Sequence, residues 1–147
     1  MIRFLQPTAA LTVITGIYLG SESGFLVGSL TAFLSNFYFG QGPWTPFQML
    51  ALGLIGLIAG YLSKIMMNKK LFIIIYGIIS GFAYSMIMDV WSTMWYSGAL
   101  SWSYYCASVI TALPHTLIYI ISNSFFLILC SDSIGKKLLR IKIKYDI

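Results

Sequence analysis

Charged residues are scarce in this chain. Only 9% of its 147 residues are charged while 59% are hydrophobic, and the mean hydropathy is +0.85. Soluble domains carry about 25% charged residues. Three intervals without any charge, 23–63, 71–88 and 90–131, are each long enough, or nearly so, for a membrane-spanning helix of about 20 residues. The composition therefore excludes an ordinary soluble domain or a nucleic-acid-binding protein and predicts a single integral membrane domain over residues 1–147.

Residues that bind metals or catalyse reactions are equally scarce. The chain has one His, two Cys and four carboxylates, and on one continuous helix Cys106 and Cys130 would lie about 36 Å apart, too far for a disulfide. This set does not supply a metal site or a catalytic pair of carboxylates. No phosphate-binding loop or dinucleotide fingerprint occurs. We therefore predict no catalytic residues, no metal and no cofactor, and any energy from ATP would have to come from a partner.

The apolar residues form five segments separated by polar or charged residues. In a bilayer the backbone must satisfy its own hydrogen bonds, and without alternating barrel strands the segments are expected to be helices. The predicted spans are roughly 4–19, 25–40, 46–63, 71–96 and 103–131. The predicted fold is thus an all-α, polytopic transmembrane helical bundle.

The distribution of basic residues predicts the orientation of this bundle. Three lysines fall within 64–70 and five basic residues fall within 132–147, and both regions should face the cytoplasm. A basic tail would also suit an anionic lipid or an acidic partner. The connections at 37–49 and 96–102 would then lie outside, as would the N-terminus. Five spans leave Arg3 outside, so we expect one further helix before Met1.

The connection "FYFGQGPWTPFQM", Phe37 to Met49, has no charge but is rich in Gly, Pro, amides and aromatic residues. Aromatic residues such as Phe39 and Trp44 are common at a membrane interface without any ligand. The amides of Asn36, Gln41 and Gln48 need hydrogen-bond partners near the membrane, either from other helices or from a polar organic solute.

Polar residues within the spans are further candidates for function. Asp89 precedes an aromatic rim that includes Trp95, while His115 and Asn123 lie in the last span. Each also fits a hydrogen bond within the bundle. Glycines recur every fourth residue from Gly16 to Gly28, a spacing that suits close helix packing inside the bundle or docking of another subunit.

Three stretches resemble the substrate-binding S components of energy-coupling factor (ECF) transporters. They are Gly24-Phe-Leu-Val-Gly28, the stretch from Ser35 to Met49 that contains the quoted connection, and Gly53-Leu-Ile-Gly56. The Gln6-Pro7-Thr8 stretch, Pro114 and Asn123 also match the family pattern. The chain departs from that pattern at Thr116 and Tyr119, where the family favours acidic and histidine residues.

The resemblance implies a six-helix protein of the bacterial cell membrane, here without its first helix. Such a protein captures a small vitamin-like solute from outside and docks onto a transmembrane coupling (T) subunit with two cytoplasmic ATPase subunits. The expected substrate-binding residues are Asn36, Phe39, Gln41, Trp44, Gln48, Asp89, Trp95, His115 and Asn123. Flavin-like, corrinoid-like and other ring compounds all fit, and the resemblance favours a corrinoid.

Two other functions fit the same composition. A small structural or assembly subunit would use the glycine-rich faces for docking and would not need Trp44 or Gln48. An intramembrane enzyme would turn over its substrate alone and would depend on His115.

Overall fold

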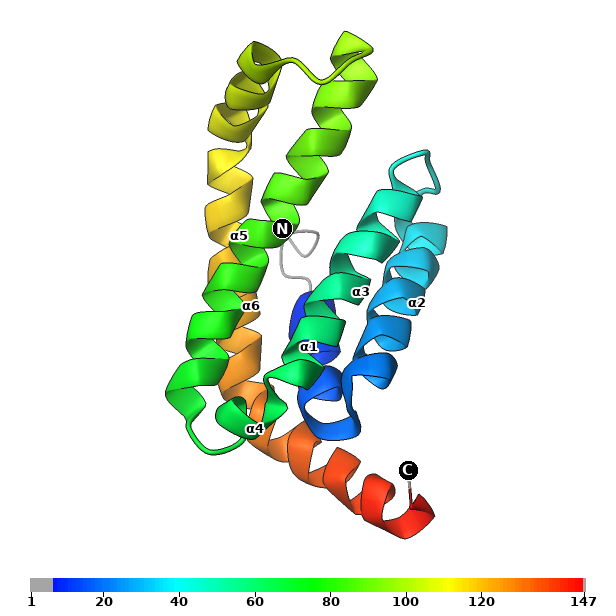
Figure 1. The fold of residues 1–147 in the computed structure, drawn as a ribbon, viewed down its shortest axis with the longest axis vertical. Coiled ribbons are helices and arrows are strands. Elements are labelled where there is room, and N and C mark those ends of the chain that lie inside the picture. Colours follow the sequence, from blue (N-terminus) through cyan, green and yellow to red (C-terminus); the bar gives the residue numbers. More distant parts are fainter. Residues whose placement is uncertain (1–6, 147) are drawn as a thin grey trace.

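The computed structural model describes residues 7–146, and this part of the chain is helical except for short connections, without any strand (Figure 1). The helices are α1 (Thr8–Leu19), α2 (Ser21–Phe39), α3 (Thr45–Tyr61), α4 (Ser63–Met66), α5 (Lys70–Ser97) and α6 (Trp102–Tyr145). The predicted all-α fold class is confirmed. By length and composition, α5 and α6 are the helices in 7–146 that could cross a membrane, and α1 and α3 are shorter apolar helices. The division into five spans stays a prediction.

Several helix ends differ from the predicted ones. The break expected between the predicted spans 4–19 and 25–40 is formed by Gly20 alone, at φ 112°. Helix α2 begins at Ser21 and carries Glu22 in its first turn, where an acidic residue suits the helix dipole. The connection expected over 37–49 is reduced to residues 40–44. The last helix continues past residue 131 to Tyr145. The predicted start at residue 4, Arg3 and Gln6 lie outside the described residues.

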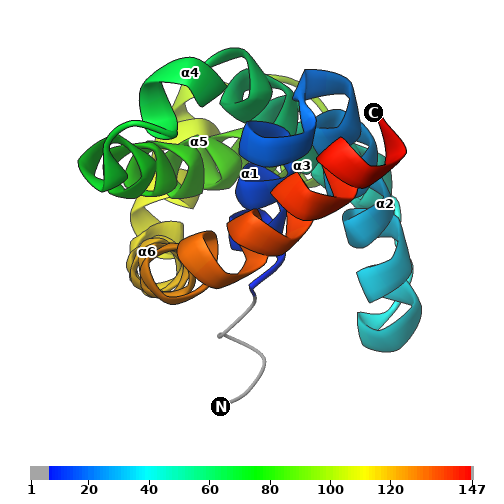
Figure 2. The ribbon, with the colours of Figure 1, turned by 90° about the horizontal axis from the view of Figure 1, so that it is seen from below.

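The short helix α1 occupies the centre of the bundle. Eight of its 12 residues are buried, among them the continuous run from Thr12 to Ile17. Figure 2 shows α1 enclosed by the longer helices. A helix that is buried over most of its length is a core helix, which agrees with the absence of charged residues from its sequence.

Helices α1, α2 and α3 pack with their backbones in direct contact at glycines. A Cβ atom on Gly16 or Gly24 would collide with the carbonyl oxygen of Gly56, and one on Gly28 would collide with that of Leu52. Small residues permit this close approach. The glycine spacing in the sequence therefore serves packing inside the bundle. We call these three helices the glycine block.

Helices α5 and α6 form an antiparallel hairpin beside the glycine block (Figure 1). Side chains connect them: Asn123 Nδ2 donates to the Gly77 carbonyl at 2.9 Å, and the Ser85 and Thr116 hydroxyls lie 2.5 Å apart. At the foot of the hairpin Lys70 forms an ion pair with Asp132. Below this point α6 turns and crosses the lower end of α1 (Figures 1 and 2).

Candidate solute-binding site

A network of amides and one hydroxyl fastens the connection between α2 and α3. Asn36 Nδ2 donates to Gln48 Oε1 at 2.7 Å and to Thr45 Oγ1 at 2.9 Å, and Thr45 Oγ1 donates to Gln41 Oε1 at 3.0 Å. Gln41 Nε2 in turn donates to the Phe33 carbonyl at 3.2 Å. Asn36 and Thr45 are each only 5% exposed. The polar residues of this irregular stretch therefore satisfy one another, which allows it to remain uncharged.

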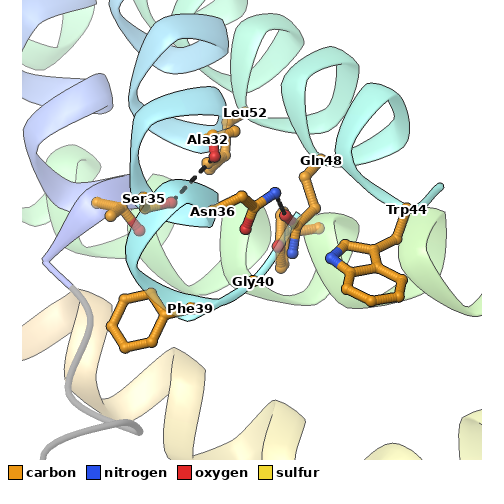
Figure 3. A pocket seen from close by; sticks show the side chains of 10 residues that line it. Ala32, Ser35, Asn36, Phe39, Gly40, Trp44, Gln48 and Leu52 are labelled. Atoms are coloured by element: carbon orange, nitrogen blue, oxygen red, sulfur yellow. Dashed lines mark hydrogen bonds between the residues drawn. The ribbon is translucent and has the colours of Figure 1, made fainter. Parts of the chain in front are cut away.

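The network forms one wall of a cavity of about 160 Å³, which we call the amide pocket. Figure 3 shows the Asn36 and Gln48 amides meeting at this cavity, with Phe39 and Trp44 on opposite sides of it. The amide pocket is lined by Thr8, Ala32, Ser35, Asn36, Phe39, Gly40, Trp44, Gln48, Leu52 and Tyr84. Helices α1, α2, α3 and α5 therefore all contribute to it, and α6 does not.

A second cavity of about 280 Å³ shares Trp44 and Gln48 with the first. Its other lining residues all come from the C-terminal half of α5, and they are Met88, Trp91, Ser92, Trp95 and Tyr96. We call this cavity the aromatic pocket. The rings of Trp91 and Trp95 lie 5.4 Å apart, and the ring of Phe47 on α3 lies 4.8 Å from that of Trp91. Two adjoining cavities, one rich in amides and one rich in indoles, thus share a common wall.

A polar layer lies below the amide pocket. Tyr84, which lines the pocket beside the Gln48 amide, stacks on Tyr119 of α6 with their ring centroids 4.9 Å apart. One helical turn further along α6, Asn123 is fully buried and donates to Gly77 and to the Ser80 hydroxyl. Within residues 7–146 neither Asn123 Oδ1 nor Ser122 Oγ has a hydrogen-bond partner.

The structure brings five of the nine predicted site residues together. Four line the amide pocket, and Trp95 lines the aromatic pocket. Gln41 lines neither cavity but holds Thr45 in place. Asp89 is 7% exposed and lines neither cavity, Asn123 lies in the polar layer, and His115 is on an exposed face of α6.

Sequence reasoning missed the contribution of α5 below its aromatic rim. Tyr84, Met88 and Ser92 line the cavities, but each resembles an ordinary residue of an apolar span. Their spacing of four residues, continued by Trp95, places them on one face of a helix. Polar and aromatic residues at this spacing mark Tyr84, Ser92 and Trp95, but Met88 carries no such mark. Thr8 and Ser35 lie in stretches that resemble the family, but their residue types gave no signal of their own.

Fold and site together define a helical membrane protein with two adjoining cavities, one lined by amides and one lined by indole rings. The family profile described as "ECF-type riboflavin transporter, S component" matches residues 2–131. The chain therefore belongs to the family of ECF transporter S components, and it is a transport component of the membrane. Comparisons with curated proteins and with solved structures gave no match.

Proposed function

We propose that this chain captures riboflavin, or a close flavin relative, from the extracytoplasmic side of the membrane. The observation that carries this proposal is the shared wall of Trp44 and Gln48 between an amide-rich and an indole-rich cavity. Riboflavin combines a flat aromatic ring system with a flexible polyol chain, so its two parts match the two cavities. The family description also favours a flavin over the corrinoid that the resemblance alone had favoured.

In this proposal the ring system enters the aromatic pocket and stacks on Trp44 and Trp95, while the polyol chain enters the amide pocket. Aromatic stacking suits a flat ring. Gln48 and the Tyr84 hydroxyl lie side by side at the boundary and would exchange hydrogen bonds with the solute. Phe39 would cover the apolar edge of the amide pocket.

Asn36 and Gln41 have a different role in this proposal. The Asn36 amide nitrogen already donates to both Thr45 and Gln48, and Gln41 holds Thr45 from the other side. They are positioning residues, because they fix the orientation of the Gln48 side chain before the solute arrives. Preorganisation of this kind lowers the entropy lost on binding.

The two outer connections would close over the bound solute. Residues 40–44 join α2 to α3, and residues 98–101 join α5 to α6. Gly40 and Gly98, at φ 106° and 70°, each end a helix and provide a flexible point for such a motion. The Phe47–Trp91 contact already connects α3 to α5 near the first of these connections.

The chain would carry out no chemistry of its own. A transmembrane coupling (T) subunit with two cytoplasmic ATPase subunits would dock onto it and use ATP to reorient the loaded bundle. The solute would thereby become accessible from the cytoplasm. This division of labour predicts flavin binding by the isolated chain, and transport only in the presence of its partners.

Titration of the detergent-purified chain with riboflavin, followed by quenching of flavin fluorescence, tests the proposal. The Trp44→Ala variant should raise the Kd at least tenfold, which corresponds to a loss of about 1.4 kcal/mol of stacking and burial. Trp102→Ala is the matched control, since Trp102 is 78% exposed and lines neither the amide pocket nor the aromatic pocket. A folded chain that binds no flavin, or equal Kd values for the two variants, would contradict the proposal.

A further inference from the structure

The last part of α6, residues 132–145, lies beyond the match to the family profile yet is firmly attached to the bundle. Gly135 is buried and packs against the ring of Tyr18, so closely that a Cβ atom would collide with it. Ile134 and Leu138 also pack against the core. This segment, which we call the basic helix end, is therefore a fixed surface of the protein.

The opposite face of the basic helix end is strongly cationic. Lys136, Lys137, Arg140 and Lys144 are all exposed, and their spacing places them on the side away from the bundle. The Asp132 carboxylate is already paired with Lys70. The four cations of this face form no ion pair with another residue in 7–146.

Exposed apolar side chains lie between these cations. Ile141, Ile143 and Tyr145 are 44%, 75% and 63% exposed. Figure 2 shows the basic helix end crossing the base of the bundle, instead of continuing along the direction of the hairpin. A helix that lies across the end of a membrane bundle with both cations and exposed apolar residues has the character of an interfacial helix.

We infer that the basic helix end binds the headgroups of anionic phospholipids in the leaflet at this end of the bundle. The cations would contact the phosphates, while Ile141 and Tyr145, which are four residues apart on one face of the helix, would lie among the upper parts of the acyl chains. An acidic protein surface would satisfy the cations but would leave no reason for the exposed isoleucines beside them. Lipid binding here is independent of flavin binding, because the two surfaces lie at opposite ends of the bundle.

Electron spin resonance with spin-labelled phosphatidylglycerol or phosphatidylcholine tests this inference on the full chain in phosphatidylcholine vesicles. The chain should select phosphatidylglycerol at least about fivefold, the effect of one basic residue at an anionic surface. The selection should decrease with salt. The ratio of the two lipid affinities should fall close to one in the fourfold variant, which carries Lys136→Gln, Lys137→Gln, Arg140→Gln and Lys144→Gln.

The matched control is Lys64→Gln with Lys69→Gln, which removes two exposed cations from the same end but leaves the basic helix end intact. This control should keep most of the selection. Thermal unfolding in detergent checks folding, and a Lys137→Gln, Lys144→Gln variant replaces the fourfold variant if that one unfolds early. Equal affinity for both lipids, or selection that survives the substitutions, would overturn the inference. It would also be overturned if the fourfold variant lost only the binding of an acidic partner subunit.

Discussion

The glycine block and the α5–α6 hairpin are held together in different ways. In the block, helix backbones touch, and an added methyl group at Gly16, Gly24 or Gly56 would meet a carbonyl oxygen. In the hairpin, side chains fill the space between the helices. A Cβ on Gly77, for example, would meet only the end of the Leu127 side chain. Backbone contacts cannot adjust without moving a whole helix, whereas side chains can change rotamer.

The candidate site lies where these two regions meet. The block supplies the amides and Trp44 on one wall, and α5 supplies Tyr84, Trp91 and Trp95 on the other. One wall is therefore fixed by backbone packing, while the other rests on a hairpin held by side chains. We therefore expect α5 and the connections 40–44 and 98–101, and not the helices of the block, to move when the proposed solute enters.

The largest expected effect comes from adding one methyl group inside the block. Gly56→Ala would place a Cβ against the Gly24 carbonyl and 2.8 Å from Thr12 Cγ2. We expect a loss of about 3 kcal/mol in the free energy of unfolding, as for other overpacked cores. Denaturant titration of the purified chain in mixed micelles measures it.

The matched substitution in the hairpin is Gly77→Ala, which tests the comparison directly. The close atom is a terminal methyl group of Leu127, which can shift more easily than a backbone carbonyl, and alanine favours a helix over glycine by about 1 kcal/mol. The net change should therefore stay within about 1 kcal/mol. Equal losses at the two glycines would show that the block and the hairpin do not differ in rigidity.

An intermediate effect is expected in the polar layer of the hairpin. Asn123→Ala removes the hydrogen bond to Gly77 and leaves a small cavity in a fully buried position. Interhelical hydrogen bonds in membranes contribute about 0.6 to 1.7 kcal/mol, so we expect a loss of about 1.5 kcal/mol in the same titration. Ser122→Ala is the control, because the Ser122 hydroxyl has no partner within residues 7–146, and its change should stay below about 0.5 kcal/mol. A larger loss from Ser122→Ala would assign the stability of this layer to a different contact.

The smallest effect is expected at the foot of the hairpin. The Lys70 and Asp132 side chains are 60% and 52% exposed, and exposed ion pairs contribute about 0 to 1 kcal/mol. A double-mutant cycle with Lys70→Gln and Asp132→Asn should therefore give a coupling energy below about 0.5 kcal/mol at physiological salt. A coupling energy above about 2 kcal/mol would mean that this ion pair, and not the packing and hydrogen bonds between α5 and α6, holds the hairpin together.

The sequence predicted the helical class because long charge-free intervals reflect the bilayer directly. It also pointed to Trp44 and Gln48, since an uncharged, amide-rich connection is unusual. It did not reveal Tyr84 or Met88, because their role depends on how α5 is rotated relative to α3. His115 stood out as the only histidine, but helix rotation places it on the exposed side while its neighbour Thr116 is buried. Rotation is set by packing between helices, which residue type alone does not encode.

The central position of α1 has a consequence for how the chain enters the membrane. Its 12 residues extend only about 18 Å, against about 30 Å of hydrocarbon, and eight of them are buried by protein. Partition into lipid therefore contributes little to keeping α1 in place. The glycine contacts with α2 and α3 therefore hold α1 at its depth, and we expect α1 to take up its final position together with those two helices.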